Sequence, residues 1–162
     1  MSSDHEIIEK VIDHALSGKG AHVAAPTVFD GLDWKLAGTR PEGAAHSIFE
    51  ILSHITFWQD WVVKWLDGKK PAIPKHASGG WPGGVSPATK KEWDGAVRNF
   101  RKGLEELGRA PKKADLLAKR GKSSPLEMLH AIASHNSYHL GQVVVLRQML
   151  GAWPPPSGGV TW

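Results

Sequence analysis

Four stretches of this chain repeat apolar residues every three or four positions, which is the pattern of an amphipathic helix. The sequence shows no regular alternation of apolar and polar residues that would indicate half-buried strands. We therefore expect an all-α protein in which four helices form a four-helix bundle. The expected helices span residues 4–16, 44–66, 86–107 and 124–150.

Glycine, proline and capping residues predict where these helices begin and end. The segment 68–85, GKKPAIPKHASGGWPGGV, contains too much glycine and proline for a helix, so we expect a long crossover loop between the second and third helices. Ser86–Pro87 and Ser124–Pro125 each place a capping residue before a proline at the first helical position. Residues 23–43 are mixed in character, with room for a short helical turn.

Length and composition indicate one ordinary globular domain, which we expect to span residues 1–162. No run of 18 apolar residues is present, and the N-terminal MSSDHEIIEK lacks the apolar segment of a secretory signal. We therefore expect a cytoplasmic protein without a membrane partner. The net charge of +4 comes largely from lysines in expected loops and helix ends. This distribution indicates solvated surface charge, so we expect no nucleic-acid partner.

The pair His135 and His139 is the strongest indication of chemistry in the chain. Residues four apart on a helix lie on one face, so both imidazoles can reach one ion. Both lie on the apolar stripe of the fourth expected helix, and His54 takes a similar position on the second. Buried imidazoles are costly unless each nitrogen has a partner, and a cation satisfies several at once. The alternative is that these histidines lie on the surface or form hydrogen bonds in the core.

Three imidazoles with one open position are typical of a catalytic metal site. Imidazole suits zinc, nickel, iron and, less well, manganese, so ligand type does not select among these divalent metals. We expect His130, which lies off the apolar stripe, to have a structural role. We expect the other histidines to face solvent or to cap helices locally: His5, His14, His22, His46 and His76.

The sequence assigns no catalytic acid or base, and no residue that binds an organic cofactor. Glu50 lies one turn before His54, where it is either solvated or a partner that orients a histidine, and Asp60 is expected to be surface charge. Tyr138 is adjacent to His139 but points about 100° away, so we expect it to pack without reaching an ion. Gln59 and Asn136 are weak candidates for a pocket rim.

Tryptophans could contribute to a pocket beside these histidines. Trp58, Trp61 and Trp65 follow one another at helical spacing, as walls of a metal pocket or as plain core. Trp81 in the crossover loop and Trp153 after the last helix line an entrance or dock their segments. We favour docking.

Two segments together resemble the DinB-like family, also called DinB/YfiT: RPEGAAHSIFEILSHITFWQDWVVKWL and SPLEMLHAIASHNSYHLGQVVVLRQMLG. The resemblance lies in a histidine on the second helix followed by H-x-x-x-H-x-G-Q on the fourth, with Gly141 and Gln142 in the matching places. It runs from Ile7 to Gly151. It implies an up-down-down-up bundle, metal ligation by His54, His135 and His139, and a homodimer.

The family resemblance also implies an activity. Known members include bacillithiol S-transferases and mycothiol-dependent isomerases, which suggests a divalent-metal-dependent enzyme acting on a small thiol and an electrophilic substrate. From the residues, the metal could activate either a thiol, giving an S-transferase, or water, giving a hydrolase. The chain has no cysteine, so the thiol would come from outside. The alternative is a non-catalytic, stress-linked bundle that binds a metal or a small molecule.

Overall fold

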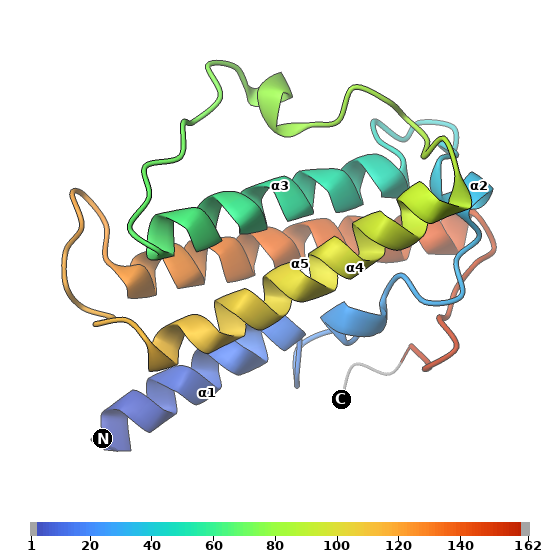
Figure 1. Cartoon of the computed structure of the whole chain (residues 1–162). Helices are drawn as coiled ribbons and strands as arrows, with labels where there is room; N and C mark the ends of the chain where they lie inside the picture. The colour runs from blue at the N-terminus through green and yellow to red at the C-terminus, as the bar shows by residue number, and fades with distance from the viewer. Residues whose placement is uncertain (1–2, 160–162) are drawn as a thin grey trace.

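The computed structural model describes residues 3–159, within which four long helices form. Figure 1 shows that these helices lie side by side. These are α1 (Ser3–Ser17), α3 (Ile48–Leu66), α4 (Lys90–Arg109) and α5 (Pro125–Met149). Between them lie the short helix α2 (Trp34–Ala37) and three 3-10 turns, η1 (Ala25–Thr27), η2 (Ala77–Gly80) and η3 (Ala110–Lys112). Residues 3–159 contain no β-strand, so the all-α prediction is confirmed.

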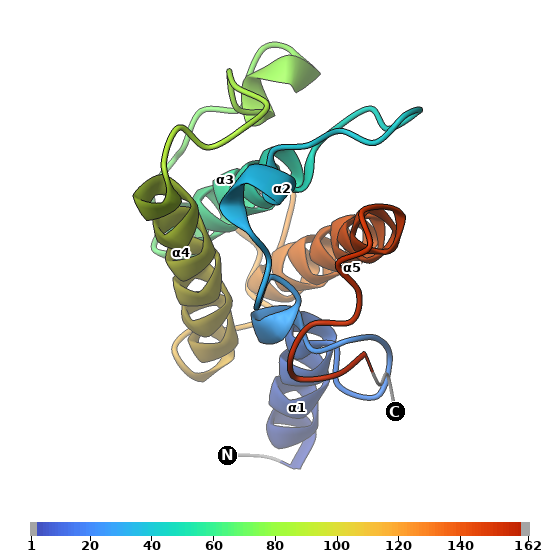
Figure 2. The same cartoon turned by 90° about the vertical axis from the view of Figure 1, so that its right-hand side faces the viewer.

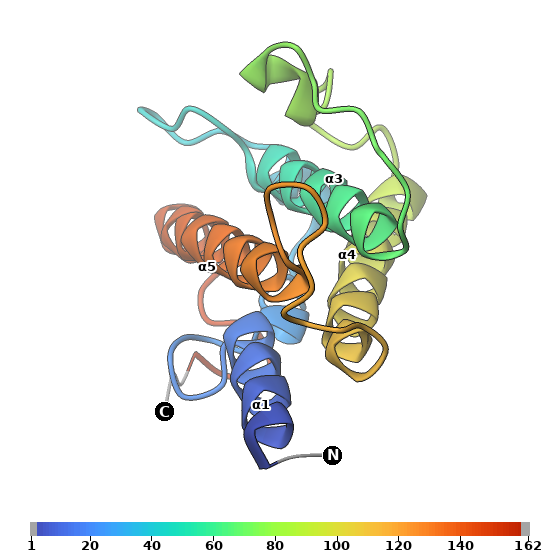
Figure 3. The same cartoon turned by 90° about the vertical axis from the view of Figure 1, so that its left-hand side faces the viewer.

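The four long helices form a bundle with up-down-down-up topology, as the family resemblance implied. α3 packs against α4 and α5, and α1 packs against the same two helices. Figure 1 shows α3 and α4 running in one direction and α1 and α5 in the other, and Figure 2 shows the four helices from one end of the bundle. Because α3 and α4 are parallel, the chain must return the full length of the bundle between them. The segment 67–89 makes this return outside α3 (Figure 3).

Capping residues explain where the helices begin. Ser47 and Glu50 form a capping box at the start of α3, so that helix begins at Ile48 and not at 44 as predicted. Thr89 caps α4, so the prediction that Ser86 caps this helix is wrong. Ser124 and Pro125 begin α5 as predicted. Ser86 instead donates its hydroxyl to the Gly38 carbonyl oxygen at 3.1 Å and ties two connections together.

The apolar interior consists of two clusters of buried side chains. One cluster includes Phe29, Ile55, Phe100 and Leu140, and the other includes Leu107 and Leu129. Where the two clusters meet, α3 and α5 carry five buried or half-buried polar residues: His54, Gln59, His135, Asn136 and His139. None of the helices within 3–159 is both long enough and apolar enough to cross a membrane.

Candidate metal centre

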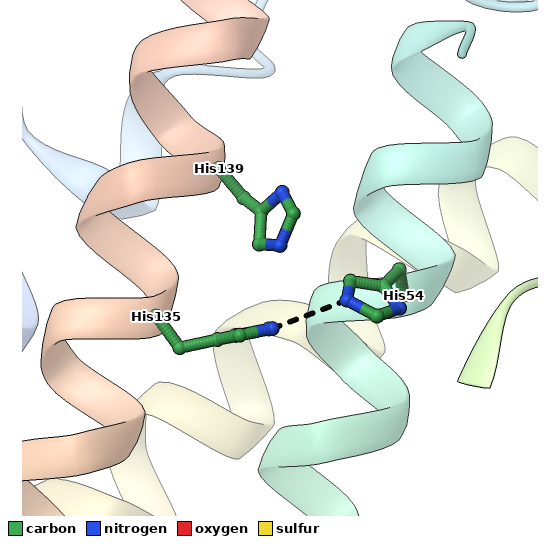
Figure 4. A group of neighbouring side chains, drawn as sticks. All are labelled: His54, His135 and His139. Atoms are coloured by element: carbon green, nitrogen blue, oxygen red, sulfur yellow. Dashed lines mark hydrogen bonds between the residues drawn. The ribbon is translucent and has the colours of Figure 1, made fainter. Parts of the chain in front are cut away.

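His54 on α3 meets His135 and His139 on α5 in the middle of the bundle. Figure 4 shows the three rings turned toward one another across the space between the two helices. One nitrogen from each ring lies within 4.8 Å of the other two, which is the geometry of a group that could hold a metal ion. His54 and His139 are each 7% exposed and His135 is half-buried. The structure therefore brings together all three histidines that the sequence singled out.

Hydrogen bonds to carbonyl oxygens fix the tautomers of two of these histidines. His54 donates its Nδ1–H to the backbone oxygen of Gly80 at 2.8 Å, and His139 donates its Nδ1–H to Oε1 of Gln142 at 2.7 Å. An amide oxygen only accepts hydrogen bonds, so both Nδ1 atoms carry the proton. Each Nε2 is left with a lone pair. Metal-binding histidines usually have such a partner on the other nitrogen.

His135 completes the set and shows why a cation fits it. Its Nε2 lies 3.1 Å from Nε2 of His54, close to the separation of about 3.3 Å between two imidazole nitrogens on one tetrahedral zinc. Its Nδ1 is buried and has no hydrogen-bond partner among the described residues. The three rings thus offer more lone pairs than the surrounding chain satisfies, and the donor set suits a divalent metal.

The environment keeps all three imidazoles neutral near pH 7. Burial lowers the pKa of His54 and that of His139 below the ordinary value. Burial, together with repulsion from the other two rings, lowers the pKa of His135 to about 4. A neutral imidazole is the form that binds a metal, so protons compete weakly for this site at neutral pH.

The long loop 67–89 closes over the histidines through a stack of three rings. Trp81 lies between His46 and His54, with ring centroids 3.7 and 4.0 Å away and planes within 12° of parallel. The preceding residue, Gly80, supplies the carbonyl that holds His54. A side chain at Gly80 would press on Trp58 and His54, so glycine permits this close approach. Trp81 therefore docks its loop, as we favoured, and also forms one wall of the site.

His46 and Gly80 are the site residues that sequence reasoning missed. We predicted that His46 faces solvent or caps a helix locally, but it is half-buried against Trp81. The same prediction is wrong for His22, because its Nε2 forms a hydrogen bond with Ser137 Oγ at 3.0 Å. The prediction that His130 is structural is also wrong, because this residue is exposed. No sequence signal identified His46, because its partner lies 35 residues away in an irregular loop.

Glu50 makes no hydrogen bond to His54, His135 or His139, although one of its oxygens lies 3.7 Å from Nδ1 of His46. Its carboxylate is buried and accepts hydrogen bonds from the Arg40 side chain and from the Ser47 backbone amide, the latter at 2.8 Å. Burial alone would raise the pKa of Glu50, but these hydrogen bonds outweigh burial and hold the pKa below its ordinary value. Glu50 is thus neither solvated nor a partner of His54, because the helix cap already uses it.

The other polar candidates lie on the surface or are sealed in the core. Asp60 pairs with Lys64 on the surface, as predicted. Tyr138 is 68% exposed because its position on α5 faces outward, and its ring packs edge-on against the His139 ring with centroids 5.0 Å apart. Gln59 and Asn136 are at most 1% exposed, so neither of these weak candidates reaches a pocket rim. Their side-chain amides have no hydrogen-bond partners among the described residues.

The tryptophans of α3 lie beside the cluster, whereas Trp153 does not. The Trp58 ring centroid is 6.4 Å from that of His54 and 6.5 Å from that of His135. Trp58, Trp61 and Trp65 line one hollow with His135. Trp153 packs against the larger apolar cluster and so serves to dock the C-terminal tail.

Comparison with known families agrees with this geometry. A model of the DinB superfamily matches residues 22–143, a range that contains α3, α4 and all three histidines. The chain belongs to the DinB superfamily. No curated protein and no solved structure gives a significant match to this DinB-superfamily chain. The family assignment thus supports the predicted fold and leaves the reaction to be argued from the site.

Proposed function

We propose that this DinB-superfamily protein is a divalent-metal-dependent enzyme that attaches a small thiol to an electrophile, with His54, His135 and His139 as the metal ligands. The observation that carries the proposal is the meeting of three neutral imidazoles, with one nitrogen of each ring within 4.8 Å of the other two. A divalent ion held there would lower the pKa of a thiol or water and supply a nucleophile at neutral pH.

The surroundings favour a thiol over water as the nucleophile. Hydrolysis usually requires a positioned general base as well as the metal. The described residues place no carboxylate in the histidine cluster, and Glu50, the nearest candidate along α3, is engaged by Arg40 and Ser47. A thiol ionises with a pKa of about 8.5, against about 15.7 for water, so a thiol needs less assistance.

The residues around the cluster have distinct tasks in this proposal. Gly80 and Gln142 hold the protons on Nδ1 and so direct the Nε2 atoms of His54 and His139 inward. Trp58 and Trp81 cover the cluster with apolar rings and limit access of water. In the transfer, the thiol sulfur bonds to the electrophilic carbon, the leaving group departs with the electrons of its broken bond, and the thiol proton passes to solvent.

The test is turnover of monochlorobimane with a panel of small thiols, using protein purified without a histidine tag and loaded with zinc or nickel. We expect conjugation that stops on chelation and that is lost in His139→Ala. The exposed loop histidine variant His76→Ala is the matched control and should keep full activity. Hydrolysis of esters without thiol would favour the hydrolase. Absence of any metal-dependent turnover would overturn the enzyme proposal and favour a non-catalytic binding bundle.

A further inference from the structure

A hollow of about 500 Å³ lies between α3 and α5 and ends at the histidine cluster. His135 lines it at one end, and Trp58 lines the hollow beside it, with its ring centroid 6.5 Å from that of His135. A second, separate hollow near Tyr138 includes none of the three cluster histidines. Of the two, the hollow beside His135 is therefore the one that a cluster histidine lines.

The walls of this hollow suit a flat apolar molecule. α3 contributes three indole rings from successive turns, and α5 contributes apolar side chains opposite them: Met128, Ala131 and Ile132. Trp58 and Trp65 are seven residues apart on one helix, which places them about 10 Å apart along its axis. Aromatic walls favour stacking and edge contacts with another ring. A molecule of two fused rings would span much of this length.

The end of the hollow away from the cluster is positively charged. The Arg120 guanidinium lies 5.8 Å from the Trp65 ring centroid and donates from Nη1 to the Leu66 carbonyl oxygen at 2.7 Å, which fixes its position. Lys122 is exposed beside it. No carboxylate is among the described residues that line the hollow, so these two cations are available to a ligand. This charge selects for an anion.

We propose that this hollow binds the electrophilic substrate as an aromatic molecule with an anionic group, the ring system lying on the tryptophans and the anion at Arg120 and Lys122. The reacting end would then lie at the histidines, about 10 Å from the anion. The inference rests on the proposed function for the identity of the ligand as a substrate. The binding site itself depends only on the walls and charges of the hollow.

Calorimetric titration with 2-naphthalenesulfonate and the uncharged 2-naphthylmethanol tests the site, on the protein as purified and after chelation. We expect the sulfonate to bind several-fold more tightly than the alcohol in both preparations. Lys122→Gln should weaken sulfonate binding about threefold and leave the alcohol unchanged. The matched control Lys112→Gln, which removes an exposed lysine outside the hollow, should change neither.

A second variant tests the aromatic wall. Trp65→Ala should weaken both probes about fivefold because each loses a stacking surface. The inference would be overturned if the two probes bound with equal affinity. It would also be overturned if Lys122→Gln left the sulfonate affinity unchanged, or if Trp65→Ala left the affinity for both probes unchanged. Because the titrations do not require turnover or bound metal, their failure would leave the thiol-transfer proposal standing. Binding without any turnover would instead support the hollow and refute the reaction.

Discussion

Helix α5 carries two buried polar sites that differ in how completely the chain satisfies them. Arg147 is 2% exposed, and its guanidinium donates to the carbonyl oxygens of Val28 at 2.6 Å, Asp30 at 3.0 Å and Ala152 at 2.9 Å. Two turns earlier, His139 faces His135 and His54, and the one hydrogen-bond contact among the three rings in the described residues is the 3.1 Å contact between Nε2 of His135 and Nε2 of His54.

The difference separates a structural polar residue from a binding one. The hydrogen bonds of Arg147 join α5 to the connection after η1 and to the C-terminal tail, so its function is complete within the chain. The histidines gain little from one another as neutral rings, and Nδ1 of His135 has no hydrogen-bond partner among the described residues. Buried polar groups left in this state are costly, and the three rings could hold a metal ion, which the Arg147 site could not.

The largest expected effect is loss of metal from the cluster. His139→Ala removes one of three ligands and should weaken zinc binding at least ~100-fold, whereas Arg147→Met should leave zinc affinity unchanged. Competition titration with a chelating indicator dye measures both. Similar zinc affinity in wild-type and His139→Ala protein would remove the distinction between the two sites.

The converse effect concerns stability. Arg147→Met should lower the free energy of unfolding by about 3 kcal/mol, because three carbonyl oxygens lose their donor. Urea unfolding of the metal-free protein followed by circular dichroism gives this value. The exposed neighbour variant Gln148→Met is the control and should change stability little. An Arg147→Met protein as stable as the wild type would show that these hydrogen bonds do not hold the connections.

A smaller effect is expected from the residue that orients His139. Gln142→Leu removes the acceptor for Nδ1–H and should weaken zinc binding about tenfold without abolishing it. Gln148→Leu on the same helix is the matched control and should bind zinc as the wild type does. If both variants bind equally well, the hydrogen bond to Gln142 does not position the ligand.

The smallest expected effect is on the pH dependence of the metal-free protein. Burial lowers the pKa of His135 to about 4 in the folded state, so between about pH 6.5 and 4 the unfolded chain binds the extra proton. Stability should therefore fall as the pH falls through this window. Urea unfolding at pH 7 and pH 5 measures how much the free energy of unfolding falls between these pH values. We expect this fall to be about 1 kcal/mol smaller in His135→Leu than in the wild type. An identical loss in both proteins would contradict the lowered pKa.

Helical periodicity explains why much of this arrangement could be predicted from the sequence. A spacing of four placed His135 and His139 on one face of α5, and the apolar stripes around them and around His54 implied that all three face the interior. The start of α5 followed from Ser124 and Pro125, because Pro125 at the first helical position and Glu127 at the third both mark Ser124 as the cap. The topology followed from the family resemblance and not from the periodicity.

The remaining features depend on tertiary contacts of irregular segments. The start of α4 was mistaken because Ser86 and Thr89 both resemble caps, and the contact of Ser86 with Gly38 decides between them. The stack of His46 on Trp81 and the carbonyl of Gly80 depend on how a loop with no periodic pattern docks on α3. Local sequence contains no signal for such contacts, since their partners are more than 20 residues away.

Anomalous diffraction from crystals of the zinc-loaded protein tests the central claim most directly. The account predicts one strong peak at the zinc edge between α3 and α5, with Nε2 of His54, His135 and His139 each at about 2.0–2.1 Å. A peak bound by other residues, or a histidine cluster that stays without zinc in saturated crystals, would contradict it.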